Sequence, residues 1–145
     1  MPAPSSRETP RQRIEQECET RGQAAVVNGC VELLSRRDAD PELVAALGGM
    51  AARWALTREP AGPDYWLRVW AARGLLWAWD DTAVAALGLA LTDEHWRVRE
   101  MALKVVARHR VDDALELVAE LQQDRVPRVR AAAGRALTRL AEGGN

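Results

Sequence analysis

The sequence predicts an all-α protein, built as a right-handed α-solenoid of about four helical hairpins. An acid, an arginine, a small residue and an aliphatic residue recur in register every 31 residues. No stretch has the alternating β-branched pattern of a strand, whereas helical spacing and helix caps run along the chain. The aligned sets are Asp93 and Asp124; Arg68, Arg99 and Arg130; Ala71, Ala102 and Ala133; and Leu75, Val106 and Leu137. A fixed period of this length is typical of stacked helical repeats.

Eight helices with short connections are expected. They cover about residues 9–22, 23–37, 41–57, 64–79, 80–91, 93–109, 112–121 and 127–142. The first begins with a capping box, because Thr9 precedes Pro10 and Gln12 follows Thr9 by three residues. Gly22 ends this helix, and the second helix follows it directly.

The third and fourth helices are separated by a turn rich in proline and glycine. Asp40 and Pro41 open the third helix. The pair Gly48-Gly49 is expected to weaken or bend it, since each glycine costs about 1 kcal/mol relative to alanine. Asp64 caps the fourth helix.

Acidic residues and a proline mark the starts of the last four helices. Asp80 with Asp81, Asp93 and Asp112 are placed as helix caps, and Pro127 lies in the first turn of the eighth helix. The expected inward positions of the fifth and seventh helices are Val84, Leu87, Leu91, Leu115, Val118 and Leu121.

Taken in consecutive pairs, the eight helices make four hairpins. Each hairpin has apolar residues on two sides and cannot bury both alone, so the hairpins have to stack. The expected organisation is a single solenoid domain over residues 9–142, with a disordered N-terminus at 1–8 and a flexible tail at 143–145.

The composition excludes several classes of protein. A formal net charge of −1 gives the whole molecule no strong attraction to nucleic acid or anionic lipid, although local patches can differ. The chain shows neither a secretory signal nor an apolar run that could span a bilayer, so a cytoplasmic protein is expected. Cys18 and Cys30 fall on apolar helix positions and are expected to be buried free thiols.

The segment from Asp124 to Leu140 contains the pattern Asp-x-x-Pro-Arg-Val-Arg-x-Ala-Ala-x-x-Ala-Leu. It resembles a HEAT repeat of the short, PBS-lyase-like subtype, and the segment from Asp93 to Val106 is a second, weaker copy. The resemblance is specific over about residues 80–142, fair over 64–79 and absent before residue 40.

The resemblance implies that first helices lie on the convex side of the solenoid and second helices on the concave side. It also implies a structural ladder between repeats, Asp93 with Arg99 and Asp124 with Arg130. Arg68 is a third rung that lacks its acid. No reaction is implied, since the fold hosts scaffolds, nucleic-acid binders and a few enzymes.

A stripe of large and basic side chains on the fourth helix lies beyond its expected packing face. At about 100° per residue, Trp66, Trp70, Arg73 and Trp77 fall within about 60° of arc. The repeat length gives the equivalent positions on the sixth and eighth helices, which are Arg97, Met101, Lys104, Arg108, Arg128, Ala132, Arg135 and Arg139. Together they predict a concave binding face that is aromatic at one end and basic at the other, with no acid in the stripe.

Two other interpretations of this stripe stay open. Arginines in an arginine-rich chain are often only a solvated helix surface. The three tryptophans can also be core residues, covered by their own hairpin and packed against Trp54.

No catalytic residue, metal site or cofactor is predicted. His95 and His109 stand 14 residues apart on the sixth helix, and neither cysteine has the spacing of a zinc ligand. A HEAT-repeat metalloenzyme family uses repeated His-Glu pairs, whereas Glu94-His95 is reversed and single. The chain also contains no Gly-rich phosphate loop.

The resulting hypothesis is a non-enzymatic scaffold module whose concave face binds a protein partner with an acidic segment. The alternative is a nucleic-acid phosphate binder that resembles HEAT-like DNA alkylation repair proteins without their catalytic acid. The protein partner ranks first because a dedicated DNA binder is usually basic as a whole. The sequence leaves the oligomeric state open.

Overall fold

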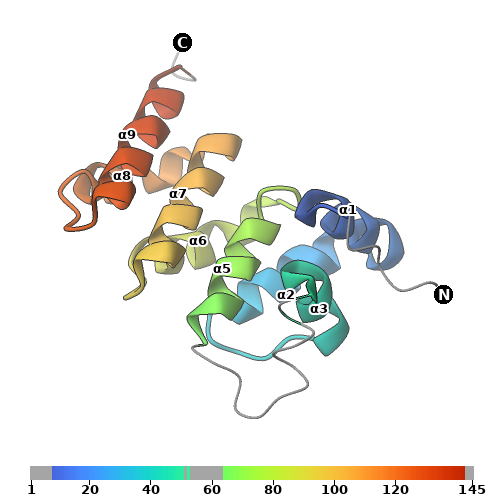
Figure 1. Ribbon diagram of the computed structural model, residues 1–145. Coiled ribbons are helices and arrows are strands. Elements are labelled where there is room, and N and C mark those ends of the chain that lie inside the picture. Colours follow the sequence, from blue (N-terminus) through green and yellow to red (C-terminus); the bar gives the residue numbers. More distant parts are fainter. Residues whose placement is uncertain (1–7, 51, 53–63, 143–145) are drawn as a thin grey trace.

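The computed structural model describes residues 8–50, 52 and 64–142. All secondary structure in these residues is helical, as predicted (Figure 1). The helices are α1 (Pro10–Arg21), α2 (Gln23–Leu34), α3 (Pro41–Gly48), α5 (Tyr65–Gly74), α6 (Val84–Leu91), α7 (Trp96–His109), α8 (Leu115–Leu121) and α9 (Pro127–Glu142). Short 3-10 turns, Asp81–Ala83 and Asp112–Ala114, precede α6 and α8. Apart from Glu8, the predicted disordered segment 1–8 and flexible tail 143–145 lie outside the described residues.

The capping box predicted at the start of α1 is present. Thr9 Oγ1 accepts a hydrogen bond from the Gln12 amide at 3.1 Å, and the Gln12 side chain accepts one from the Thr9 amide at 2.9 Å. Gly22 ends α1 with a φ of 91°, a conformation that glycine adopts without steric cost. The Asp40 side chain caps α3 by accepting a hydrogen bond from the Glu42 amide at 2.9 Å.

The predicted third and fourth helices are both shorter than expected. α3 ends at Gly48, because Gly49 takes a φ of 66° and turns the chain. The prediction of one helix through Gly49 is therefore wrong, and Trp54 lies outside the described residues. α5 ends at Gly74, after which tight turns carry the chain to Ala78.

Helices that follow one another along the chain pack against each other, as expected for consecutive hairpins. The contacts join α1 with α2, α3 with α5, α6 with α7 and α8 with α9. In the N-terminal half further contacts join the hairpins, since α1 also packs against α3, and α2 also packs against α5 and α6.

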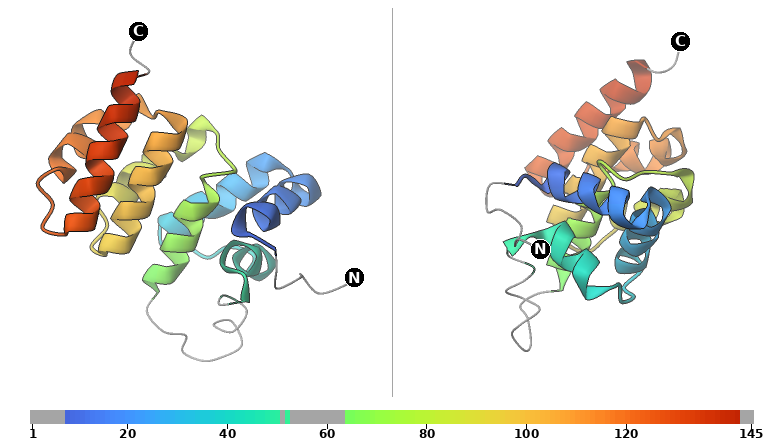
Figure 2. Two further views of the ribbon diagram at one scale, coloured as in Figure 1. Left: turned by 45° about the horizontal axis from the view of Figure 1, so that its top comes forward. Right: turned by 90° about the vertical axis from the view of Figure 1, so that its right-hand side faces the viewer.

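The stack has two rows of helices. In the left view of Figure 2, α3 and α7 lie on opposite sides of α5, and α9 lies beyond α7. The other row contains α1, α2, α6 and α8. This layered arrangement is the predicted all-α solenoid, and it places a helix on each side of α5.

Apolar side chains between the rows form one continuous core. In α7, Val98, Ala102 and Val105 are fully buried, whereas Arg97 and Lys104 are exposed. Burying a large aliphatic side chain stabilises the fold by about 1.5–3 kcal/mol.

The inward positions predicted for α6 and α8 are only partly correct. Leu87, Leu91 and Val118 are fully buried. Leu115 is 50% exposed, because the 3-10 turn before α8 places Ala114, and not Leu115, against the core.

Candidate binding surface

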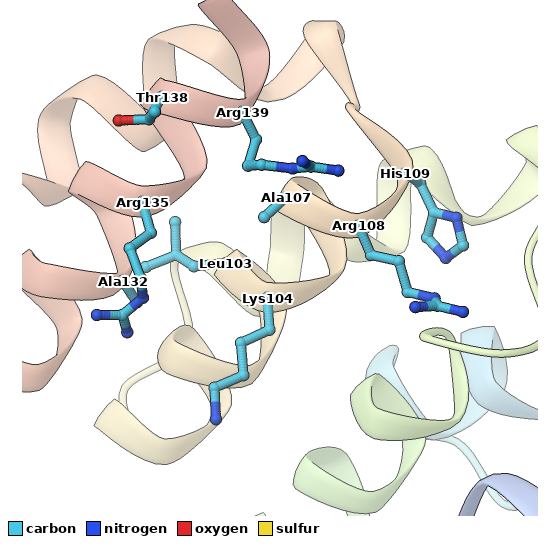
Figure 3. A pocket seen from close by; sticks show the side chains of 9 residues that line it. All are labelled: Leu103, Lys104, Ala107, Arg108, His109, Ala132, Arg135, Thr138 and Arg139. Atoms are coloured by element: carbon cyan, nitrogen blue, oxygen red, sulfur yellow. The ribbon is translucent and has the colours of Figure 1, made fainter. Parts of the chain in front are cut away.

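A hollow of about 740 Å³ lies between α7 and α9, and basic side chains surround it (Figure 3). We call it the cationic hollow. Lys104 and Arg108 come from α7, and Arg135 and Arg139 come from α9. In each helix the two residues are four positions apart and therefore share one face. The apolar part of the lining is Leu103, Ala107 and Ala132.

The charge of the cationic hollow is largely uncompensated. Within the described part of the chain, no acidic side chain lines it, and Lys104, Arg108 and Arg135 form no ion pair. Arg139 pairs with Glu142 at 3.3 Å, where both side chains are about half exposed. A concave site lined by one sign of charge concentrates the opposite charge, so this hollow attracts anions.

One end of the cationic hollow is held rigidly by His109. The His109 Nε2–H donates a hydrogen bond to the Leu75 carbonyl oxygen at 2.7 Å, and the ring stacks on Trp79 with centroids 4.8 Å apart. Burial lowers the pKa of His109, and the positive charge of Arg108 adds to this, so the ring is neutral at pH 7.

Aromatic and cationic side chains interlock at the start of α5, α7 and α9. The Arg97 guanidinium lies over the rings of Trp66 and Trp96, at 5.1 and 4.8 Å from their centroids. Arg128 lies 5.2 Å from the Trp96 centroid and pairs with the buried Glu100 at 2.9 Å. The protein itself therefore engages Arg97 and Arg128, two of the predicted binding residues. The predicted stripe contains no acidic residue, but the neighbouring Glu100 forms an ion pair with its residue Arg128.

Buried arginines join successive helix pairs. Arg68 Nε donates to the Asp93 carboxylate at 2.6 Å, and Arg99 Nε donates to the Asp124 carboxylate at 2.9 Å. Arg99 and Arg130 also donate to the backbone carbonyls of Asp93 and Asp124, at 2.8 and 2.7 Å. The resemblance implied that the Asp93 carboxylate pairs with Arg99 and the Asp124 carboxylate with Arg130, whereas these carboxylates pair with Arg68 and Arg99. Each acid binds the arginine of the preceding pair, and Arg68 does not lack an acid.

The hydrogen bonds of this ladder keep its acids ionised. Burial opposes the charge on Asp93 and Asp124. Hydrogen bonds from their arginines and from backbone N–H groups outweigh that cost and lower the pKa of both carboxyl groups.

A family profile described as HEAT repeats matches residues 53–138, which is more than half of the chain. The chain belongs to the HEAT-repeat family. No curated protein and no solved structure matches it. HEAT repeats commonly serve as protein-interaction scaffolds, because stacked helix pairs form an extended surface.

In this HEAT-repeat stack, α3 covers two of the predicted binding residues. Trp70 is only 8% exposed and packs against Gly48. Arg73 Nη2 donates to the Leu47 carbonyl oxygen at 2.7 Å, near the end of α3. Burial, together with the nearby Arg13, lowers the pKa of Arg73. Trp70 and Arg73 are therefore packing residues, and the open interpretation of the tryptophans as core residues holds for Trp70.

The other predicted apolar residues of the stripe are half-buried. Trp66, Trp77 and Met101 pack against the core and keep part of their surface accessible. Trp77 lines a second hollow of about 440 Å³ together with Leu76 and Trp79. We call it the aromatic hollow. Trp77 thus borders an open cavity of the HEAT-repeat stack.

The described residues contain no group of three or more His, Cys, Asp or Glu side chains that could hold a metal ion. No helix among them is long and apolar enough to cross a membrane. Burial raises the pKa of Cys30 to about 12, whereas Cys18 is only half-buried. His95 stacks on Tyr65 with ring centroids 3.6 Å apart, so it serves packing.

Trp96, Glu100 and Trp79 also belong to this surface and were not predicted from the sequence. One signal for Glu100 exists in the chain. Glu100 and Arg128 are 28 residues apart, one helical turn less than the repeat length, and stacked helices bring such positions together. No comparable signal marks Trp79, because it lies in the turn after α5.

Proposed function

We propose that this HEAT-repeat chain is a binding module without catalytic activity, and that its cationic hollow takes an acidic segment of a partner protein. The observation that carries the proposal is the charge of Lys104, Arg108 and Arg135 around an apolar floor, where no acid of the described residues pairs with them or lines the hollow. Carboxylates form charge-assisted hydrogen bonds with such groups, and a partner's methylene groups fit the floor.

A protein segment suits this surface better than a nucleic-acid backbone. Within the predicted stripe, Arg97 and Arg128 are engaged by Trp66, Trp96 and Glu100. The exposed stripe cations that form no ion pair or aromatic contact with other described residues all lie around one hollow, and these are Lys104, Arg108 and Arg135. A compact patch matches a few carboxylates, whereas a phosphate backbone is usually followed by cations along a longer track. The net charge of −1 points the same way.

A fluorescent oligoglutamate peptide tests the proposal by anisotropy. Arg135→Ala is expected to weaken binding about five- to tenfold, since a charge-assisted hydrogen bond contributes about 1–1.5 kcal/mol at an exposed site. Arg37→Ala is the matched control, because Arg37 is 70% exposed and lies outside both hollows. It removes the same charge and should change the affinity less than twofold.

Two results would contradict the proposal. One is equal weakening by Arg135→Ala and Arg37→Ala, which would indicate attraction by overall charge alone. The other is tighter binding of a single-stranded oligonucleotide than of the peptide, with log Kd rising with log salt at about 0.7 per phosphate contact.

A further inference from the structure

The aromatic hollow adjoins the cationic hollow at the end of α7. Arg108 and His109 line both of them. In Figure 3 these two side chains extend from α7 away from the arginines of α9. Two cavities that share two lining residues lie side by side. The cationic hollow lies between α7 and α9, and the aromatic hollow lies beside the turn that follows α5.

The aromatic hollow has a mixed lining. Its apolar side chains are Leu76, Trp77 and Trp79, and its polar ones include Arg11, Gln23, Arg108 and His109. Among the described residues Glu15 is the one acid in this lining, and it is paired with Arg11 at 2.6 Å. Leu76 and Trp77 are partly buried and keep part of their surface accessible. Partly accessible tryptophans in a concave site are usual anchors of protein interfaces.

Hydrogen bonds and stacking hold the junction of the two hollows in place. His109 is bonded to Leu75 and stacked on Trp79. The Gln23 side chain donates to the Trp79 carbonyl oxygen at 2.6 Å, which ties the turn to α2. A surface held in this way loses little freedom when it binds a ligand, which favours affinity.

We infer that one extended segment of a partner protein occupies both hollows, with its carboxylates in the cationic hollow and an apolar side chain against Trp77. Basic side chains in one hollow and accessible tryptophan in the adjoining one are complementary to such a segment. The inference rests on the proposed function and adds one requirement, which is an apolar residue in the partner segment. Acidic residues alone would occupy only the cationic hollow.

Three labelled probes test the inference: an oligoglutamate peptide, and the same peptide extended through a glycine-serine spacer to a leucine at its N-terminus or at its C-terminus. One of the two extended peptides is expected to bind wild-type protein about tenfold tighter than oligoglutamate, because a leucine side chain leaves water. Trp77→Ala should abolish this gain, so that the ratio of the affinities for the extended peptide and for oligoglutamate falls to about one. Trp66→Ala, at a half-buried tryptophan outside both hollows, should keep it.

The outcomes separate the two proposals. If oligoglutamate fails to bind, the proposed function fails. If oligoglutamate binds but neither extension adds affinity, or if Trp77→Ala keeps the gain, the inference alone is overturned. If the Trp77→Ala variant fails to fold, a second measurement on the wild-type protein takes its place. Extended peptides that carry a brominated leucine analogue should quench the tryptophan fluorescence. The inference would be overturned if these peptides quenched the fluorescence no more strongly than the free brominated amino acid at the same concentration.

Discussion

Burial decides how much each charged residue of the ladder contributes. The Arg68 guanidinium lies near three acids, Asp93 at a buried position and Asp64 and Glu94 at exposed ones. The Asp93 contact is 2.6 Å with both side chains about 5% exposed, whereas Asp64 lies at 3.6 Å and is 77% exposed. A buried charge that loses its partner costs about 3–5 kcal/mol, whereas an exposed pair contributes about 0–1 kcal/mol. Asp93 therefore contributes far more to stability than Asp64, although both lie near the same guanidinium.

Asp93→Asn is expected to lower the free energy of unfolding by about 3 kcal/mol, because it leaves the charge of Arg68 buried without its counterion. Asp64→Asn removes the same charge from the same guanidinium and should cost less than about 1 kcal/mol. Urea unfolding followed by circular dichroism measures both. Similar losses in the two variants would show that burial of the pair has no special role.

At the scale of the element, α3 determines which tryptophans of α5 are accessible. It lies on the side of α5 opposite α7, covers Trp70 and receives the hydrogen bond from Arg73 (Figure 2). Its close approach depends on Gly48, where a Cβ would lie 2.7 Å from the Trp70 ring and also against Ala52. The small size of this residue, more than its flexibility, is what the packing of α3 on α5 requires.

Gly48→Ala tests this packing against Gly134→Ala in α9. Alanine in a helix is usually more stable than glycine by about 0.5–1 kcal/mol. At Gly134 a Cβ meets nothing within 4 Å, so this gain should appear in full. At Gly48 the overlap with Trp70 should reverse it to a loss of about 1–3 kcal/mol. Thermal unfolding of the two variants gives the signs, and stabilisation by both would contradict the close contact of α3 with α5.

At the scale of the whole molecule, the near-zero net charge conceals two surfaces of opposite sign. The cationic hollow lies between α7 and α9. The 3-10 turn and α8 in the other row carry exposed acids, which are Asp112, Asp113, Glu116 and Glu120. A chain with a net charge of −1 can therefore present a basic depression to one partner.

Acid should destabilise the molecule in two steps. Burial lowers the pKa of His109 in the folded protein. Below about pH 6.5 the unfolded chain therefore binds a proton at His109 before the folded chain does, and the free energy of unfolding decreases as the pH decreases. Asp93 and Asp124 also have a lowered pKa, so their contribution is lost below about pH 4. Calorimetric Tm values across this range should stay level near neutrality, decline below about pH 6.5 and fall more steeply below about pH 4.

The variant His109→Gln isolates the first step. Glutamine keeps a side-chain N–H donor for the Leu75 carbonyl and does not titrate. The decline between about pH 6.5 and pH 5 should therefore become smaller, whereas the steeper fall below about pH 4 should stay. A first decline of unchanged size would rule out His109 as its source.

The repeat in the sequence was enough to predict helices, stacking and fold class, because a helix pair with two apolar sides has to stack. The capping box at Thr9 and the rows of basic residues on α7 and α9 follow from local spacing and were predictable in the same way. The different exposure of the tryptophans was not predictable from the sequence, since it depends on which helices lie beside α5.

The tertiary structure alone decided that α3 packs against both α1 and α5, which places α3 over Trp70 and Arg73. It also decided that each ladder acid binds the arginine of the preceding pair, and that Glu100 neutralises Arg128. The physical reason is that a periodic pattern fixes which face of a helix is apolar. Which neighbour covers that face depends on contacts between segments far apart in the chain.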